Sequence, residues 1–114
     1  MSLQRWYLRG LGIFFILVSI TLVTDLLANG FRAETWHKIL HVLLGGVMVW
    51  ASFKASVSSC RTFNRFNGAL FVVVAIIGWT FPDLGGLDAF NRVDTILHSI
   101  VGLSSGGVGL WRKD

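Results

Sequence analysis

Charged side chains are scarce in this sequence. They make up 14% of its 114 residues, while 54% of the residues are hydrophobic. Soluble domains carry about 25% charged residues. A water-soluble domain of this size exposes much of its surface, and the chain has too few polar residues to cover it. The shortage argues against a soluble globular protein.

Cysteine and proline are almost missing as well, with one residue of each, Cys60 and Pro82. A single cysteine can form no disulfide within the chain and no paired-cysteine metal motif. The sequence also lacks a nucleophile elbow and a phosphate-binding glycine loop. Nothing therefore points to an enzyme, and we predict none.

What the sequence has instead is four long stretches without Asp, Glu, Lys or Arg, at residues 10–24, 39–53, 66–82 and 95–111. Each is somewhat shorter than the roughly 20 residues of a membrane-spanning helix. Flanking basic residues can extend a span by sending their charge to the interface. None of the stretches has a polar stripe at helical period, as a surface helix has. They predict four transmembrane helices.

The tryptophans independently support these spans. An indole ring prefers the headgroup level of a membrane because it combines an apolar body with one N–H donor. All five tryptophans fall near the end of a stretch: Trp6, Trp36, Trp50, Trp79 and Trp111. We expect spans over about residues 7–27, 35–53, 65–81 and 92–111.

The segments between the spans carry turn and stop signals. Asn29-Gly30 predicts a turn after the first span, and residues 54–64 form a polar stretch that we expect to be a loop. Pro82 with Asp83 ends the third span, and Gly85-Gly86 lies in the loop that follows. By its length the whole chain, residues 1–114, is a single domain.

The basic residues predict how the chain lies in the membrane. Three basic residues lie in the first and third loops, namely Arg32, Lys38 and Arg92. The other seven lie at the two ends and in the middle loop: Arg5, Arg9, Lys54, Arg61, Arg65, Arg112 and Lys113. The excess places both termini and the middle loop in the cytoplasm, with the protein in the cytoplasmic membrane. Topology thus explains the net charge of +4, and the expected partner is the lipid bilayer rather than nucleic acid.

The two halves of the chain carry the same pattern. The stretch Ile39–Gly45 corresponds to Ile96–Gly102, which lies half a chain length later. Each stretch begins with Ile-Leu-His and ends with a glycine. Upstream, Arg9-x-x-Gly12 answers Arg65-x-x-Gly68. We therefore predict an all-α four-helix bundle in a 2+2 internal repeat, with repeats over about residues 7–53 and 65–111. Each repeat crosses the membrane twice, so the repeats have the same orientation, unlike inverted-repeat transporters.

In both halves a histidine lies one helical turn from a glycine, His41 with Gly45 and His98 with Gly102. Small residues at such spacing let two helices approach closely in lipid. The glycines that we assign to helix packing are Gly45, Gly102, Gly106 and Gly109.

Three interpretations stay open for His41 and His98, since an ionisable side chain within a span is costly and usually faces the bundle interior. The first is a hydrogen-bonded seam that joins the two halves. The second is bis-histidine ligation of a haem, with Gly45 and Gly102 making room for the macrocycle. The third is a cluster that holds a transition-metal ion or responds to protons. Its members would be His37, His41, His98, Asp94, Asp25 and Asp83.

With these motifs the chain resembles an uncharacterised family of small four-span prokaryotic membrane proteins, known only as a domain of unknown function. The likeness lies in Trp36-His37-x-x-Leu40-His41-x-x-x-Gly45, in Asn91-x-x-Asp94-x-x-Leu97-His98-x-x-x-Gly102, and in Gly68. It extends from about Gly10 to Leu110. The resemblance implies the fold and the membrane location, and it implies no activity and no cofactor.

The expected function is that of a small structural or accessory membrane module without a cofactor. It would act through helix contacts, in a homo-oligomer or in a larger membrane complex. The alternative is a haem- or metal-binding, redox or pH-sensing membrane protein that uses His41 and His98.

Overall fold

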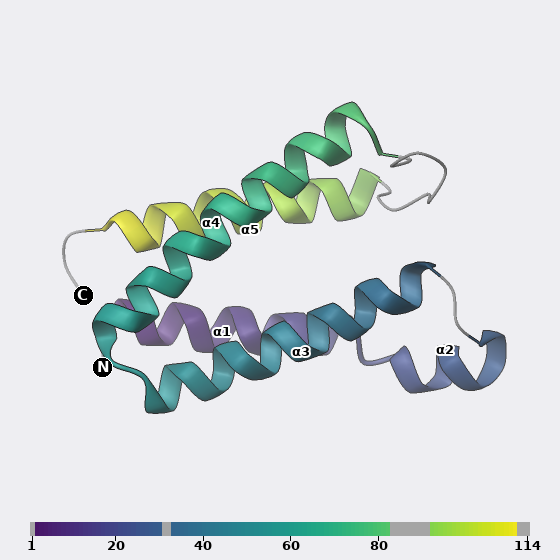
Figure 1. Cartoon of the computed structure of the whole chain (residues 1–114), viewed down its shortest axis with the longest axis horizontal. Coiled ribbons are helices and arrows are strands. Elements are labelled where there is room, and N and C mark those ends of the chain that lie inside the picture. The colour runs from purple at the N-terminus through teal and green to yellow at the C-terminus, as the bar shows by residue number, and fades with distance from the viewer. Residues whose placement is uncertain (1, 31–32, 83–91, 112–114) are drawn as a thin grey trace.

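The computed structural model describes residues 2–30, 33–82 and 92–111, except for the side chains of residues 33 and 34. All regular secondary structure in this part of the chain is helical. Its helices are α1 (Leu3–Val18), α2 (Leu22–Asn29), α3 (Ala33–Lys54), α4 (Val57–Thr80) and α5 (Arg92–Leu110). Helices α1 and α3 pack as one hairpin and α4 and α5 as a second (Figure 1). The all-α prediction is confirmed.

The first predicted span is not one continuous helix. Helix α1 ends at Val18, and the backbone N–H of Ser19 bonds to the carbonyls of Ile16 and Leu17. The stretch Ser19–Thr21 consists of hydroxyl-bearing and β-branched residues, which are weak helix formers. The chain then forms the short helix α2. The predicted turn at Asn29-Gly30 is confirmed, because α2 ends there and Gly30 has a left-handed φ of 70°.

The expected loop over residues 54–64 and the expected start of the third span at Arg65 are wrong. Helix α4 begins at Val57, two turns earlier. Ser56 caps it by accepting a hydrogen bond from the backbone N–H of Ser59, as an N-cap serine does. The polar first turns of α4 are helical because Cys60 and Asn64 turn into the bundle, where both are fully buried.

Glycines set the close approach of the helices within each hairpin. A Cβ atom on Gly12 of α1 would lie 2.7 Å from the carbonyl oxygen of Gly45 on α3. A Cβ atom on Gly68 of α4 would lie 2.6 Å from the backbone of Gly106 on α5. Only glycine leaves enough room for these backbone contacts.

Arginine side chains donate hydrogen bonds to carbonyls at the C-terminal end of the second helix in each hairpin. In the first hairpin, Arg5 and Arg9 donate to the carbonyl oxygen of Ser52 at 3.1 and 3.3 Å. In the second, Arg65 donates to the carbonyl oxygen of Gly109 at 2.6 Å. A guanidinium group there satisfies carbonyls that lack helical partners and lies at the negative end of the helix dipole.

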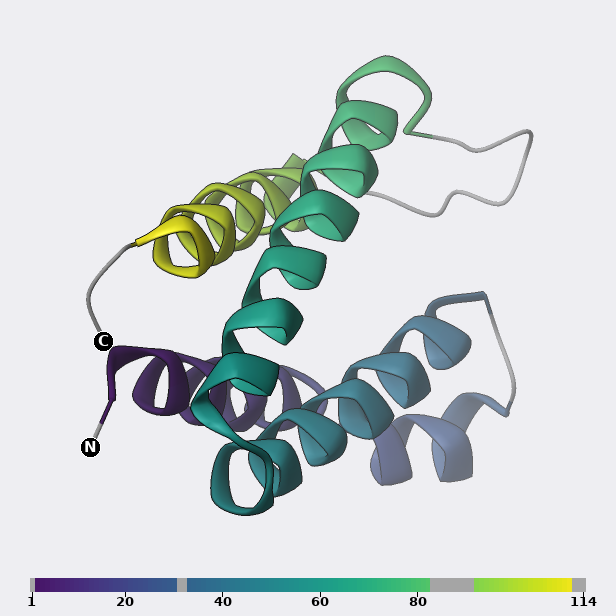
Figure 2. The same ribbon diagram turned by 60° about the vertical axis from the view of Figure 1, so that its left-hand side comes forward.

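The two hairpins are joined by a polar seam near the start of α1, formed by Gln4, Tyr7, Asn64 and Ser105. Asn64 donates to the side-chain oxygen of Gln4 at 2.9 Å, and Gln4 donates to the carbonyl of Val108 at 2.7 Å. The hydroxyls of Tyr7 and Ser105 are 2.8 Å apart. From this end the hairpins diverge toward α2 and the start of α3 (Figures 1 and 2).

The distribution of side chains differs from that in a water-soluble domain. Polar residues are buried between the helices, among them Gln4, Ser52, Asn64, Asn67 and Ser105. Large apolar residues cover the outside, for example Leu40, Leu43, Trp50, Leu103 and Leu110. Soluble monomers rarely expose continuous apolar surface. This surface suits a lipid environment.

Three helical segments of the described chain are long and apolar enough to cross a membrane: Leu3–Asn29, which contains both α1 and α2, then α4 and α5. Helix α3 has 22 residues but is not among them. Its first turns contain His37, Lys38 and His41, which lower its hydropathy. The second expected span, residues 35–53, thus coincides with the helix that carries two of the three histidines.

Candidate metal-binding site

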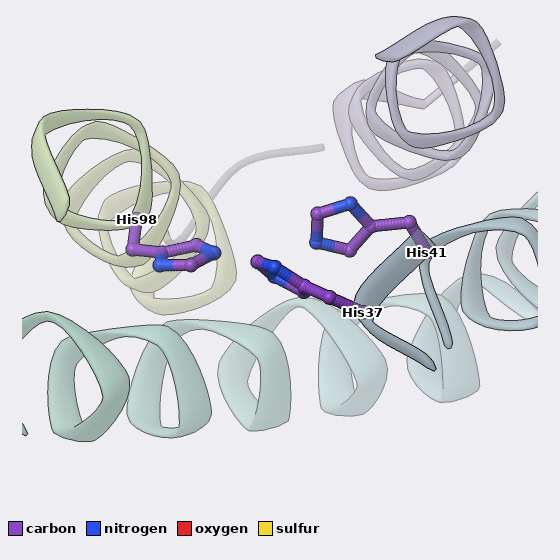
Figure 3. Close-up of side chains that lie close together, drawn as sticks. All are labelled: His37, His41 and His98. Carbon is purple, nitrogen blue, oxygen red and sulfur yellow. The ribbon is translucent and has the colours of Figure 1, made fainter. Parts of the chain in front are cut away.

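Three histidines lie together where the hairpins diverge (Figure 3). His37 and His41 stand four residues apart on α3, so they share one face of that helix. His98 comes from α5, in the other hairpin, where it is 5% exposed. The cluster therefore joins the two halves of the molecule. We call these three residues the histidine cluster.

The rings are close enough to act on one ligand. Ring centroids are 4.3 Å apart for His37 and His41, 5.5 Å for His37 and His98, and 6.2 Å for His41 and His98. The three rings thus form a triangle in which His37 is the nearest neighbour of each of the other two (Figure 3). One ring nitrogen from each residue can be chosen so that all three lie within 4.8 Å of one another.

Two phenylalanines pack against the histidine cluster. Phe15 of α1 packs on His41 with a centroid distance of 5.1 Å. Phe71 of α4 stacks on His98 at 5.5 Å and an interplanar angle of 25°. The two phenylalanines also contact each other edge to face at 5.2 Å. All four helices of the two hairpins therefore contribute to the position of the imidazoles.

A cavity of about 210 Å³ opens beside the histidine cluster. We call it the vestibule. Besides the three histidines, its polar lining consists of Lys38 and Asp94. Asp94 lies in the first turn of α5, where a carboxylate is favoured by the helix dipole. Lys38 forms an ion pair with Asp25 of α2 and donates to the hydroxyl of Thr21 at 3.1 Å.

A second and larger cavity, of about 540 Å³, is lined by the same three histidines. It runs between α3 and α4, and we call it the α3–α4 groove. Its remaining lining is entirely hydrocarbon: Leu40, Leu43, Leu44, Val47, Phe66, Leu70, Phe71 and Val74. The histidine cluster thus separates a partly polar vestibule from an apolar groove.

The space next to the two motif glycines is filled by neighbouring helices. A Cβ atom on Gly45 would meet the Gly12 carbonyl at 2.6 Å. A Cβ atom on Gly102 would meet the backbone nitrogen of Val72 at 2.7 Å. The neighbouring helices α1 and α4 therefore fill the space beside Gly45 and Gly102. No free space next to these glycines is left for a ligand of the histidines.

The comparison with known protein families agrees with the sequence motifs. Residues 23–111 match the domain of unknown function DUF4383. The chain belongs to this family. The match includes the whole of α3, α4 and α5 and all three histidines, and it confirms the resemblance to an uncharacterised family. No curated protein and no solved structure matches the chain.

In this DUF4383 protein the structure brings together four of the six residues of the expected cluster. His37, His41 and His98 are in contact, and Asp94 lines the adjoining vestibule. Asp25 instead pairs with Lys38, and Asp83 lies outside the described residues. Of the glycines assigned to packing, a Cβ on Gly109 would lie 2.8 Å from the Arg65 nitrogen, whereas one on Gly106 would be 3.9 Å from Gly68.

The sequence did not identify the seam residues Gln4, Tyr7 and Asn64. Asn64 lies in the polar stretch 54–64, whose composition predicts a loop, whereas in the structure it is part of α4 and faces α1. The available signal was polarity: an asparagine or glutamine next to a membrane span tends to hydrogen-bond across helices.

Proposed function

We propose that this protein is an integral membrane protein that binds one divalent transition-metal ion between its two hairpins, through His37, His41 and His98. The observation that carries the proposal is the convergence of three ring nitrogens within 4.8 Å, from two separate hairpins. In a tetrahedral zinc site with bonds of about 2.0–2.1 Å, ligand nitrogens lie about 3.4 Å apart. Small side-chain rotations and slight closure of the hairpins supply the difference.

The donor set favours particular ions. Neutral imidazole suits zinc, copper, iron and nickel, whereas magnesium and calcium prefer oxygen ligands. Three histidines leave one coordination position of a tetrahedral ion open, which is typical of catalytic and transport sites rather than of closed structural ones. Asp94 on the vestibule would offset part of the ion's charge. The proposal is limited to binding of the ion.

The same geometry favours an ion over a haem. A porphyrin ligated by His41 and His98 would have to lie between their rings, and the ring of His37 lies close to both, with centroids 4.3 and 5.5 Å away. The room that Gly45 and Gly102 were expected to provide is occupied by α1 and α4. A single ion needs no such space.

We also propose that α3 spans the membrane, so that the chain crosses four times with both termini in the cytoplasm. A helix of 22 residues is about 33 Å long, enough for the hydrocarbon core. Apart from Lys54 at its end, the exposed side chains described for this helix are apolar, including Leu40, Leu43, Val47 and Trp50. Its histidines face inward, toward α5.

An internal 2+2 duplication accounts for a repeated contact. Arg9 bonds to Ser52 in the first hairpin, and Arg65 bonds to Gly109 in the second. Both arginines precede a packing glycine by three residues, and both acceptors follow a cluster histidine by eleven residues on the same helix (41 to 52, 98 to 109). Equivalent residues thus make equivalent contacts.

The accessory role in a homo-oligomer or a larger membrane complex remains a second candidate. It is favoured by Gly46 and Gly107, which are exposed and have open space where a side chain would be. Small exposed residues allow a further helix to approach in lipid. Cross-linking in native membranes tests this role, and a monomer that co-purifies with no other protein would contradict it.

Zinc binding by the purified protein tests the main proposal. After treatment with a chelator, we expect the protein in nanodiscs to take up one Zn²⁺ per chain, measured by elemental analysis and calorimetry. His98→Ala should weaken zinc binding at least tenfold, because the second hairpin then offers no ligand. Ser99→Ala on the same helix and Cys60→Ser at the other end should bind as the unaltered protein does. Zinc binding that survives His98→Ala would overturn the proposal.

A further inference from the structure

The α3–α4 groove gives the histidine cluster a second side that faces the lipid. Its lining side chains, apart from the three histidines, contain only carbon and hydrogen, and none carries a charge. Leu40, Leu43 and Val47 are exposed on α3, as is Phe66 on α4. A molecule in the groove would therefore come from the bilayer, with its apolar part along these residues and its polar part at the imidazoles.

The chemistry of the groove limits the polar part of that molecule. A phospholipid would bring an anionic phosphate, which Arg and Lys bind, yet neither Arg nor Lys is among the described residues that line the groove. The arginines Arg5, Arg9 and Arg65 bind helix ends at the opposite end of the molecule. A neutral head with an oxygen acceptor fits better, because it can accept a hydrogen bond from an imidazole or bind the ion.

The aromatic side chains favour a flat head. Phe71 lies in the wall of the groove and stacks on His98, and Phe66 lines the same groove one turn away on α4. Flat rings gain from offset or edge contacts with such side chains. The free volume of about 540 Å³ exceeds that of the vestibule and continues along α3 to Val47, which leaves space for a hydrocarbon tail.

We propose that the α3–α4 groove binds a lipid-soluble quinone, with a carbonyl oxygen at the histidine cluster and the tail along α3 and α4. The inference rests on the proposed metal site, because the carbonyl oxygen would take the coordination position that three imidazoles leave open. Water-borne ions reach the cluster from the vestibule, and the quinone reaches it from the bilayer. The protein would then be a site where a metal ion and a quinone meet.

The test uses a benzoquinone with a decyl tail, added to the zinc-loaded full-length protein in nanodiscs and followed by calorimetry. Val47→Trp places a bulky side chain in the groove away from the histidines. Ile76→Trp on α4 is the matched control, since Ile76 is exposed to a similar degree but does not line the groove. We expect Val47→Trp to weaken quinone binding at least tenfold and Ile76→Trp to leave it unchanged. Both variants should bind zinc normally.

The outcomes separate this inference from the proposed function. Normal zinc binding with no quinone binding, or with equal binding by both tryptophan variants, would overturn the quinone site and leave the metal site intact. Displacement of the quinone by phosphatidylglycerol would also overturn it, in favour of a phospholipid. Quinone binding that depends on Val47 in a protein that binds no zinc would support the groove and overturn the metal site.

Discussion

At the scale of single residues, two kinds of glycine lie in these helices. Gly12, Gly45, Gly68 and Gly102 each face the backbone of a neighbouring helix at distances that a methyl group could not share. Gly107 has nothing within 4 Å of the position of a Cβ atom. Sequence spacing alone does not separate the two kinds, because glycines of both kinds lie within the same helices.

Gly68→Ala should therefore destabilise the second hairpin. Its methyl group would lie 2.6 Å from the backbone of Gly106, and overpacking of this kind costs about 1–3 kcal/mol. Gly107→Ala on the facing helix is the matched control and should cost nothing. The free energy of unfolding can be measured by SDS titration in mixed micelles, with circular dichroism as the signal. Equal stability of the two variants would show that α4 and α5 are not in such close contact.

Asn64 joins the hairpins through a single polar side chain. Its amide donates to both the backbone and the side-chain oxygen of Gln4, at 3.1 and 2.9 Å. Asn64→Ala should lower the free energy of unfolding by about 1 kcal/mol, since hydrogen bonds between membrane helices have about this value. Thr62→Ala is the control, because Thr62 bonds only within its own helix.

The coupling of Asn64 to Gln4 can be measured directly in a double-mutant cycle. If the pair interacts as described, Gln4→Ala should cost much less in the Asn64→Ala background than in the unaltered protein. Additive effects of the two substitutions would contradict a direct bond between them.

At the scale of helices, the sequence predicted their positions well where apolar stretches were long, although the described chain contains five helices rather than four. Helix α5 matches its expected span, residues 92–111, to within one residue, and α3 extends one or two residues beyond its expected ends. The proximity of His41 and His98 was also expected from sequence, because the repeat hypothesis places the two histidines on corresponding faces of corresponding helices. His37 joined them because it lies one turn from His41.

The errors have physical causes as well. The break at Ser19–Thr21 contains neither glycine nor proline, so no strong local signal marks it. The start of α4 was missed because its first turns are polar, and polarity was taken as a sign of a loop. Those turns are helical because Asn64 and Cys60 face other helices rather than water. Local composition cannot reveal such tertiary partners.

Each hairpin is nearly self-contained, since most close backbone contacts lie within α1–α3 and within α4–α5. We therefore expect residues 1–55 and 56–114 to reassociate when they are expressed as two chains in one membrane. The pair should co-purify through an affinity tag on one piece and bind zinc. A cut within α3, between residues 44 and 45, is the control and should give no complex. Failure of the first pair to co-purify would show that the connection at Ala55-Ser56 is required.

At the scale of the whole molecule, the polar seam and the histidine cluster hold the hairpins at two different levels. The seam at Tyr7 and Ser105 is hydrogen-bonded. The cluster lies seven residues along α5 from Ser105, about 10 Å away. An ion there would connect α3 to α5, and it would stabilise the folded protein by mass action, with a free energy that rises with the logarithm of the ion concentration.

Because the polar seam lies about 10 Å from the histidine cluster, a small rotation of one hairpin against the other changes the distances between the histidines. Bringing ligand nitrogens from 4.8 Å to the roughly 3.4 Å of a zinc site over a lever of about 10 Å needs a rotation of about 8°. Helices in a bilayer tilt by comparable amounts to match its thickness. Zinc affinity should therefore differ several-fold between nanodiscs of short-chain and long-chain lipids, whereas His98→Ala should abolish that difference. The thickness of the surrounding membrane would then determine how tightly the protein holds its ion.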